Sequence, residues 1–257
     1  MPQPHLSIEF FCATDTGRAR SNNEDSVTVD HANSLAVLAD GMGGYNAGEI
    51  ASGMATTFIQ RELGRWLEEV GDSATDPEVR RAMDICVDNA NPQYAGMGTT
   101  LVVAVFRGTR VLIGHVGDSR AYRLRGGRLM QVTRDHSLLQ EQIDAGLITP
   151  EQASFSANKN LVTRAVGVED TVLLEIHQHE VHPGDLYLMC SDGLSDMLDD
   201  ESLSQLLQAH ESLDEAGAAL IAAANDAGGK DNIAIILARA PGSPAASTKS
   251  WWAPFRR

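Results

Sequence analysis

The sequence predicts an α+β protein in which antiparallel sheets are covered by pairs of helices. Two observations favour this fold class. Strand-like segments follow one another directly and are joined by short turns, and the helical segments come in consecutive pairs. A doubly wound parallel sheet would instead alternate single strands with single helices. At 257 residues the chain is long enough for one large domain or two small ones, and it contains no internal repeat.

The first half of the chain reads as strands followed by a helix pair. The expected elements are, in order, a strand over 7–13, a polar and turn-rich stretch over 14–26, a strand over 34–39, and helices over 47–70 and 77–89. The first helix is predicted from apolar residues at helical spacing, among them Ile50, Met54, Phe58 and Leu67. Asp76 is expected to cap the second helix, because a proline follows at the first helical position.

The second half begins with a block of strands and ends with a second helix pair and one more strand. The expected elements are strands over 99–106, 111–116, 120–125, 128–132, 171–181 and 185–190, helices over 199–210 and 212–226, and a last strand over 232–238. A tight hairpin is predicted at Gly126-Gly127. Residues 134–168 form a long polar insertion, the kind of segment that often carries function. We expect one domain over 1–240 and a flexible tail over 241–257 with a Trp-rich end.

The composition narrows the function classes. The formal net charge of −15 argues against a general binder of nucleic acid or of anionic membranes. Cys12, Cys86 and Cys190 are expected to be buried free thiols, since three is an odd number and a chain of this size needs no disulfides. No apolar run is long enough to span a membrane, and the N-terminus has no signal-peptide pattern, so we expect a cytoplasmic protein.

Four aspartates stand at the ends of apolar, strand-like runs. Asp40, Asp118 and Asp192 each close such a run, and Asp231 precedes another. The exit of one strand and the entry of an antiparallel neighbour lie at the same end of a sheet, so these carboxylates are expected to gather there. Four like charges in one place repel one another unless a cation lies between them. The pattern therefore predicts a multinuclear metal site, and oxygen ligands without a His or Cys cluster favour Mg²⁺ or Mn²⁺.

Nearby glycines and one arginine add to this pattern. Gly41 opens a run with three glycines in four residues, more than a turn requires, and its carbonyl is a candidate oxygen ligand. Arg20 precedes Glu24 and Asp25 by four and five residues. One interpretation of this segment is a solvated loop. The other is that Arg20 binds a phosphate while the two carboxylates face a cation or its waters.

Several segments taken together resemble one protein family. RSNNED, LADGMGG, GMGTT, VGDSR, LVTRAVG, CSDGLSD and GGKDN occur in the order and rough spacing of the metal-dependent protein phosphatases, the type 2C serine/threonine phosphatases, and are most similar to the compact bacterial members. The resemblance covers about residues 8–239. It implies a central β-sandwich of two antiparallel sheets flanked by helix pairs, in α-β-β-α layers. It also implies an enzyme that hydrolyses phosphoserine and phosphothreonine on proteins.

The resemblance further implies a set of metal ligands. Asp40 would bridge two Mn²⁺ or Mg²⁺ ions, with the carbonyl of Gly41 beside it. Asp192 and Asp231 would complete the pair of ions, and Asp118 would bind a third. A metal-bound hydroxide would then attack phosphorus in line, without a phosphoenzyme.

Other positions match the family as partners of substrate and water. Arg20 matches the phosphate-binding arginine, and Glu24 and Asp25 match the acidic pair that holds metal-bound water. Asn232 follows the last ligand, and residues 134–168 correspond to a mobile flap beside the site. Met42 departs from many eukaryotic relatives, which have a histidine proposed to protonate the leaving group. Methionine cannot donate that proton, so we expect a metal-bound water in its place.

The resemblance also implies partners. We expect phosphorylated protein substrates and a cognate serine/threonine kinase that the enzyme opposes, with type VI secretion control as one of several bacterial contexts. We expect no nucleic-acid partner, no membrane span, and a monomer. A second hypothesis, from another class, is a catalytically silent module that binds phosphoproteins, and the intact ligand positions argue against it.

Two further patterns indicate other chemistry. Residues 12–18 show the C-x5-R spacing of cysteine phosphatases, but Asp15 would place negative charge in the phosphate cradle, and the surrounding strand would raise the pKa of the cysteine. His177 and His179 would share a strand face and suit zinc, although such residues are more often solvated. His115 lies in an apolar strand and is expected to be a core residue with its hydrogen bonds made, or a residue that contacts a metal ligand without binding the metal itself.

Overall fold

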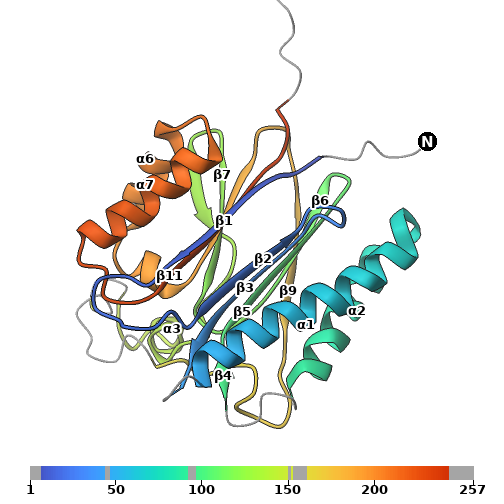
Figure 1. The fold of residues 1–257 in the computed structure, drawn as a ribbon, viewed down its shortest axis with the longest axis horizontal. Helices are drawn as coiled ribbons and strands as arrows, with labels where there is room; N and C mark the ends of the chain where they lie inside the picture. Colours follow the sequence, from blue (N-terminus) through green and yellow to red (C-terminus); the bar gives the residue numbers. More distant parts are fainter. Residues whose placement is uncertain (1–6, 44–46, 92–96, 150–151, 153–160, 243–257) are drawn as a thin grey trace, which may run out of the picture.

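The structure, a computed structural model, describes residues 7–43, 47–91, 97–149, 152 and 161–242. Two antiparallel sheets face each other, and helices cover the outer face of each sheet, giving four layers (Figure 1). The predicted α+β sandwich with α-β-β-α layers is therefore confirmed.

Each sheet takes its strands from both halves of the chain. The five-stranded sheet has the order β1 (Glu9–Asp15), β11 (Ile233–Arg239), β10 (Leu186–Cys190), β7 (Arg120–Arg125) and β8 (Arg128–Gln131). The six-stranded sheet has the order β2 (Asp25–Asp30), β3 (Leu35–Met42), β5 (Leu101–Arg107), β6 (Arg110–Val116) and β9 (Glu175–Glu180), with the short β4 (Gly98–Thr99) paired to β3. The predicted hairpin joins β7 to β8, and Gly126 and Gly127 have φ values of 57° and 78° there.

The helices lie in two pairs on the outside of the sandwich (Figure 1). Over the six-stranded sheet lie α1 (Ala47–Val70) and α2 (Asp76–Ala90), joined by a 3-10 turn at Gly71–Ser73. Over the five-stranded sheet lie α6 (Asp200–Ala209) and α7 (Leu213–Asp226). Two short helices are α3 (Leu138–Asp144), inside the predicted flap, and α5 (Asp192–Ser195), which directly follows β10 and was not predicted.

Alternate residues of the central strands face two different hydrophobic cores, which explains their unbroken apolar runs. In β3, Leu35 and Val37 pack in the core beneath α1 and α2, while Ala36 and Leu38 pack in the core between the two sheets. A third core lies between the five-stranded sheet and α6 and α7. The strands that reach the site are thus held on both faces.

The sequence prediction misses the edge strand β2. This strand begins at Asp25, within the stretch predicted to be polar and turn-rich, and continues to Asp30. As an edge strand it is only partly buried, so Val27 and Val29 alternate with polar residues instead of forming an apolar run. The first strand, β1, begins at Glu9, two residues later than predicted.

The first helix has the predicted limits, and Leu67 is buried as predicted, but Ile50 and Met54 do not mark its buried face. Ile50 and Met54 keep 48% and 41% of their surface exposed, whereas Ala51, Ala55 and Ile59 are buried. Small residues allow the helix to approach the sheet closely, and a search for large apolar residues does not detect such a face.

Two local predictions need correction. Thr75, not Asp76, caps α2, and it forms a capping box in which the Glu78 carboxylate accepts the Thr75 N–H at 2.7 Å. Cys12 is exposed on the edge strand β1, so only Cys86 and Cys190 are buried free thiols as expected.

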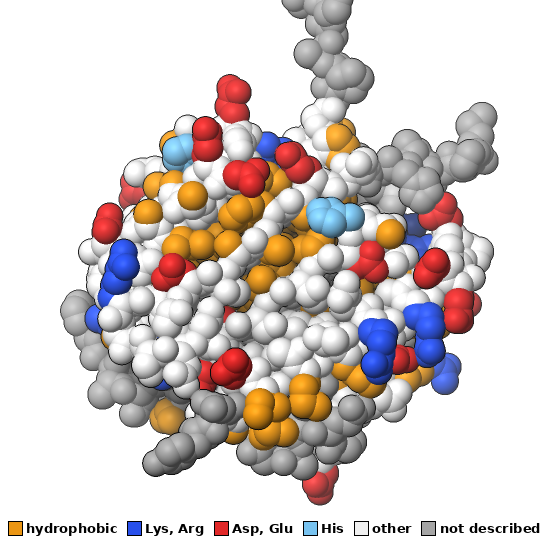
Figure 2. Space-filling view, in the orientation of Figure 1, with side chains coloured by type: hydrophobic (Ala, Val, Ile, Leu, Met, Phe, Trp, Pro, Cys, Tyr) orange, Lys and Arg blue, Asp and Glu red, His pale blue; other side chains and the backbone are white. Residues whose placement is uncertain are grey.

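The surface of the described part of the chain reflects the acidic composition. Acidic side chains are spread around the face shown in Figure 2, in keeping with the net charge of −15. Within the described residues, no helix has the length and apolar character needed to cross a membrane. Of the predicted tail, only residues 241 and 242 belong to the described part of the chain.

Candidate metal centre

The four predicted aspartates lie together at one end of the sandwich, with Asp25 beside them. Asp40 is opposite Asp25 in the pairing of β3 with β2. Asp192 follows β10, and Asp231 precedes β11, the antiparallel neighbour of β10. Asp118 lies between β6 and β7 and is only 9% exposed. Antiparallel neighbours from both sheets therefore deliver carboxylates to the same place.

Burial and mutual repulsion raise the pKa values of these carboxyl groups. Burial, followed by the charges of Asp25, Asp192, Asp118 and Asp231, raises the pKa of Asp40 well above its usual range. Burial, followed by Asp118 and Asp231, does the same to the pKa of Asp192. Burial is also the largest cause that raises the pKa of Asp25 to about 7 and that of Asp118 to about 6. A cation among these groups would supply the opposite charge that they lack.

Backbone hydrogen bonds fix the end of β3 that carries Asp40. Thr100 donates its N–H to the Asp40 carbonyl at 2.8 Å, and its hydroxyl accepts the Asp40 N–H at 3.0 Å. The Gly41 N–H donates to the carbonyl oxygen of Glu24 at 3.0 Å. Position 41 requires glycine, because a Cβ there would collide with the carbonyl oxygen of Gly48 in α1. The chain segment of the two predicted ligands, Asp40 and Gly41, is thus rigidly placed.

Asn232 organises the loop that carries Arg20 and Glu24. Its Oδ1 accepts the Glu24 N–H at 2.8 Å, and its Nδ2 donates to the carbonyl oxygens of Thr16 and Asn22 at 3.0 and 2.7 Å. All of these bonds reach the connection between β1 and β2. The resemblance predicted a supporting position for Asn232 next to the last ligand, through the GGKDN segment, but it did not predict these three backbone partners.

Arg20 and Asp25 are both bound within the site. Arg20 Nη2 lies 2.7 Å from Asp231 Oδ2, and 53% of the arginine side chain is exposed. The arginine predicted to bind phosphate is therefore at the aspartate cluster, with about half of its side chain open to solvent. The Asp25 carboxylate accepts the Ser191 hydroxyl at 2.7 Å, and Ser191 in turn accepts the Ala234 N–H at 2.9 Å.

A pair of hydroxyl groups joins the Asp118 turn to the Asp40 strand. Ser119 Oγ lies 2.7 Å from Thr100 Oγ1, the same atom that accepts the Asp40 N–H. Both hydroxyl groups are buried. Thr100 therefore connects the two regions in which metal ligands are predicted; it belongs to the GMGTT segment of the family resemblance, from which no role was predicted for it.

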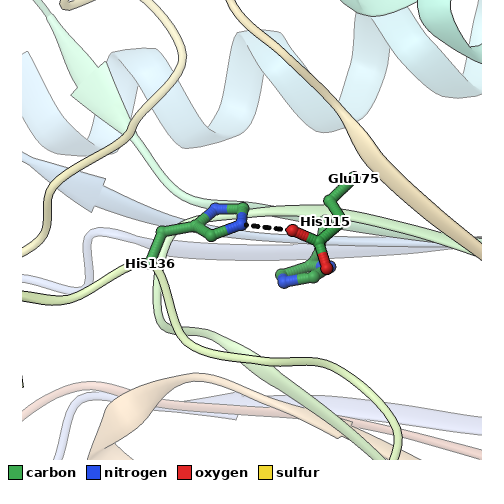
Figure 3. Close-up of side chains that lie close together, drawn as sticks. All are labelled: His115, His136 and Glu175. Carbon is green, nitrogen blue, oxygen red and sulfur yellow. Dashed lines mark hydrogen bonds and ion pairs between the residues drawn. The ribbon is translucent and has the colours of Figure 1, made fainter. Parts of the chain in front are cut away.

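The donor set suits hard cations that keep part of their water shell. The aspartates offer oxygen only, which Mg²⁺ and Mn²⁺ prefer. Within the described residues, the one group of three acidic, His or Cys side chains with ligand atoms within 4.8 Å of one another is His115, His136 and Glu175 (Figure 3). Among the described residues, no three of the aspartates have ligand atoms within that distance of one another.

The two alternative patterns lack the geometry of a site. Cys12 lies opposite Ile236 in the β1–β11 pairing, and although the residue is exposed, partial desolvation of its thiol raises the pKa, the opposite of what a nucleophilic cysteine needs. The rings of His177 and His179 are 6.4 Å apart and tilted by 40°, and among the described residues they join no group of three close metal donors.

Comparison with known proteins decides the family. Residues 15–237 match the model of the protein phosphatase 2C family. The chain belongs to this family. The serine/threonine protein phosphatase PstP of Mycobacterium tuberculosis is 37% identical in an alignment 251 residues long that covers 93% of this chain and 46% of PstP. The chain thus spans about half the length of that relative. The serine/threonine phosphatase Stp of Listeria monocytogenes is 35% identical over 87% of this chain and 92% of Stp.

Solved structures of bacterial 2C-type phosphatases share the fold. The S. agalactiae serine/threonine phosphatase superimposes with a TM-score of 0.82 at 34% identity, over 92% of this chain and 100% of that one. The catalytic domain of PstP in complex with 2 manganese ions gives 0.77 at 35% identity, over 92% and 99%. PppA, described as a key regulatory component of T6SS in Pseudomonas aeruginosa, gives 0.79 at 32% identity, over 91% and 99%. The predicted family is confirmed.

Proposed function

We propose that this protein removes phosphate from phosphoserine and phosphothreonine in proteins, with Mn²⁺ or Mg²⁺ as the cofactor. The observation that carries the proposal is the group of buried carboxyl groups at one end of the sandwich, whose pKa values are raised by burial and by one another. Membership of the 2C family supports the same reaction.

The proposed ligands follow from the position of each carboxylate. Asp40 is central, because the charges of all the other aspartates act on it, and we assign it to bridge two ions. Asp192 and Asp231 would complete the pair, with the Gly41 carbonyl as a further ligand, and Asp118 would bind a third ion. Bound cations of this kind lower the pKa of water and offset the negative charge of phosphoryl oxygens.

The chain's own groups would bind and orient the substrate. Arg20 is half-exposed and would exchange Asp231 for the phosphate, for which a guanidinium has a matching fork of donors. Glu24 and Asp25 would accept hydrogen bonds from water beside the phosphorus. Asn232 would act on these groups indirectly, through its three bonds to their loop.

A cavity at the end of β3, where Met42 follows Asp40 by two residues, offers room for the residues that flank the phosphate. It has a volume of about 320 Å³ and is lined by Met42, Gly98, Glu169 and the flap residues Val162 and Arg164, among others. Because Met42 cannot donate a proton, we propose that water protonates the leaving alkoxide. The physiological substrates would be phosphoproteins made by an opposing serine/threonine kinase, and type VI secretion control is one possible setting. Phosphoproteomics with and without the protein would test which phosphoproteins are its substrates.

The decisive experiment measures hydrolysis of an aryl phosphate with Mn²⁺, with Mg²⁺ and with EDTA. We expect activity only in the presence of a metal. We also expect Asp40→Asn and Asp192→Asn each to lower kcat/KM by more than about 100-fold, because loss of a residue that only supports a metal ligand typically costs about 10- to 100-fold. Asp214→Asn, a charge-matched change in the first turn of α7, should have no effect.

Wild-type rates in both aspartate variants would refute the ligand assignment. A protein that binds phosphopeptides but hydrolyses nothing with any divalent metal would instead be the silent binding module.

A further inference from the structure

His136 is bound to the residue before Asp118 by both its backbone and its side chain. Its N–H donates to the carbonyl oxygen of Gly117 at 2.9 Å, and its Nδ1 accepts the Gly117 N–H at 3.1 Å. The histidine is only 6% exposed. No motif singled out in the sequence contains this residue, which lies at the start of the predicted flap.

Glu175 in β9 holds His136 in the tautomer that this contact needs. Because Nδ1 accepts a hydrogen bond, the proton of the neutral ring is on Nε2, and Nε2 lies 3.1 Å from Glu175 Oε2 (Figure 3). Burial acts to raise the pKa of Glu175, but hydrogen bonds from His177 and His136 outweigh it and lower the value to about 2. The carboxylate therefore stays ionised and keeps accepting the Nε2 proton.

The trio of His115, His136 and Glu175 brings three donors close together, yet its geometry does not suit a metal. The Nε2 lone pair of His136 is unavailable while Nδ1 accepts the Gly117 N–H. The two imidazole rings are stacked, with centroids 4.6 Å apart and planes 16° apart, so their in-plane lone pairs run side by side and do not converge. Instead, the imidazole of His136 links the Glu175 carboxylate, at Nε2, to the Gly117 N–H, at Nδ1.

The Gly117–Asp118 turn is packed against Thr100 on the side away from His136. Gly117 has a φ of 103°, and a Cβ there would lie 2.7 Å from Thr100 Cγ2. On the far side of His136, its carbonyl accepts the Thr163 N–H at 2.8 Å, where the flap returns to the sandwich. The turn thus lies between Thr100 and the imidazole, the imidazole is held by Glu175 of β9, and the backbone of His136 is held by Thr163.

We propose that Glu175 and His136 form a positioning pair that sets the Gly117–Asp118 turn, and with it the Asp118 carboxylate, for a cation. The proposal rests on the metal-dependent function proposed above, because Asp118 has a cation to meet only in that case. His136 touches neither phosphate nor metal in this scheme and acts through the Gly117 amide.

Two substitutions separate the two ends of the imidazole. His136→Asn places an oxygen where Nδ1 was and can still accept the Gly117 N–H, whereas His136→Gln places its polar group near Nε2 and cannot. His177→Ala is the matched control, because it removes another histidine from the same carboxylate, 2.8 Å from Glu175 Oε1, without approaching Gly117.

The first readout is hydrogen exchange of the Gly117 amide by NMR in the metal-free protein. We expect strong protection in the wild type, in His177→Ala and in His136→Asn, and loss of protection in a folded His136→Gln. The second readout is Mn²⁺ binding by calorimetry, in which Asp118→Asn identifies the step that belongs to Asp118. We expect His136→Gln to weaken that step by about 10- to 100-fold, the usual effect of losing a partner of a metal ligand.

The outcomes distinguish this inference from the proposed function. A folded His136→Gln with wild-type protection at Gly117, or with an unchanged Asp118 step, overturns the positioning pair, as does equal damage from His136→Asn. Absence of Mn²⁺-dependent hydrolysis in the wild type, with the exchange pattern as expected, overturns the proposed function instead.

Discussion

At the scale of single residues, Asn232 uses one amide to hold three separate backbone groups. Its oxygen accepts one N–H and its nitrogen donates to two carbonyl oxygens, which exhausts both donor hydrogens. Aspartate has nearly the same shape but no donors. An Asn232→Asp substitution therefore removes the hydrogen-bond donors while keeping the packing.

We expect Asn232→Asp to lower the unfolding free energy by about 1–3 kcal/mol, the cost of leaving buried polar groups without partners, and to raise KM through the displaced Arg20 loop. Urea unfolding and steady-state hydrolysis measure the two effects. Gln178→Glu, the same chemical change at an exposed position, is the control. An Asn232→Asp protein with the stability and KM of the wild type would contradict this account of the loop.

The acidic cluster should make stability depend on pH in opposite ways with and without metal. Folding raises the pKa of Asp25 to about 7 and that of Asp118 to about 6, above the unfolded value of about 3.9. Between about pH 4 and 7 the folded state therefore holds more protons than the unfolded one, so the metal-free protein loses stability from these groups as the pH rises.

Metal binding requires the ionised carboxylates, so cations compete with protons for them. We expect Mn²⁺ to raise the melting temperature more at pH 8 than at pH 5.5, relative to EDTA at the same pH. Thermal unfolding followed by circular dichroism measures this difference. An equal or larger shift at pH 5.5 would count against a cation site at these groups.

At the scale of elements, a strand or helix is easier to predict from the sequence when more of its faces are buried by large apolar residues. Strands buried on both faces, such as β3 and β5, are continuous apolar runs and were predicted nearly to their ends. The edge strand β2 has one partly exposed face and was missed, and α5 is too short to show a helical period. The buried face of α1 was misread because it consists largely of small residues.

A pair of glycines in and near α1 should respond to alanine in opposite ways. Gly41→Ala places a Cβ against the Gly48 carbonyl, so we expect lower stability and weaker Mn²⁺ binding as α1 is pushed away from β3. Gly53 lies inside α1, and a Cβ there meets nothing within 4 Å, so Gly53→Ala should stabilise the fold by about 0.5–1 kcal/mol. Chemical unfolding of both variants tests the pair, and effects of the same sign would contradict this close packing.

At the scale of the whole molecule, the position of the aspartates was predictable because strand ends and strand direction determine it. What the sequence could not show is the network between them. The clamp by Asn232, the hydroxyl link from Thr100 to Ser119 and the contact of His136 with Gly117 depend on residues that are distant in the chain. Such contacts follow from three-dimensional packing, and no local pattern announces them.

The folded unit should end just after the last strand. Ala240 is buried, and its N–H donates to the Asp185 carbonyl at 2.9 Å. We expect a chain that stops after Gly242 to keep the melting temperature and kcat/KM of the full chain, and one that stops after Leu237 to be clearly less stable. Differential scanning calorimetry and hydrolysis assays compare the two, and loss of activity in the longer form would assign a catalytic role to the tail.

The pairing of β1 with β11 also determines how late in synthesis the fold can close. The first strand of the chain pairs along seven positions with the last, from Glu9 opposite Arg239 to Asp15 opposite Ile233. While the ribosome is still translating, β1 has no partner, and contacts so distant in sequence form slowly. Asp231 and Asn232 emerge immediately before β11, so a nascent or prematurely terminated chain lacks part of the acidic cluster and the clamp of its loop. Hydrolysis by the proposed site would therefore begin only after nearly the whole domain has left the ribosome.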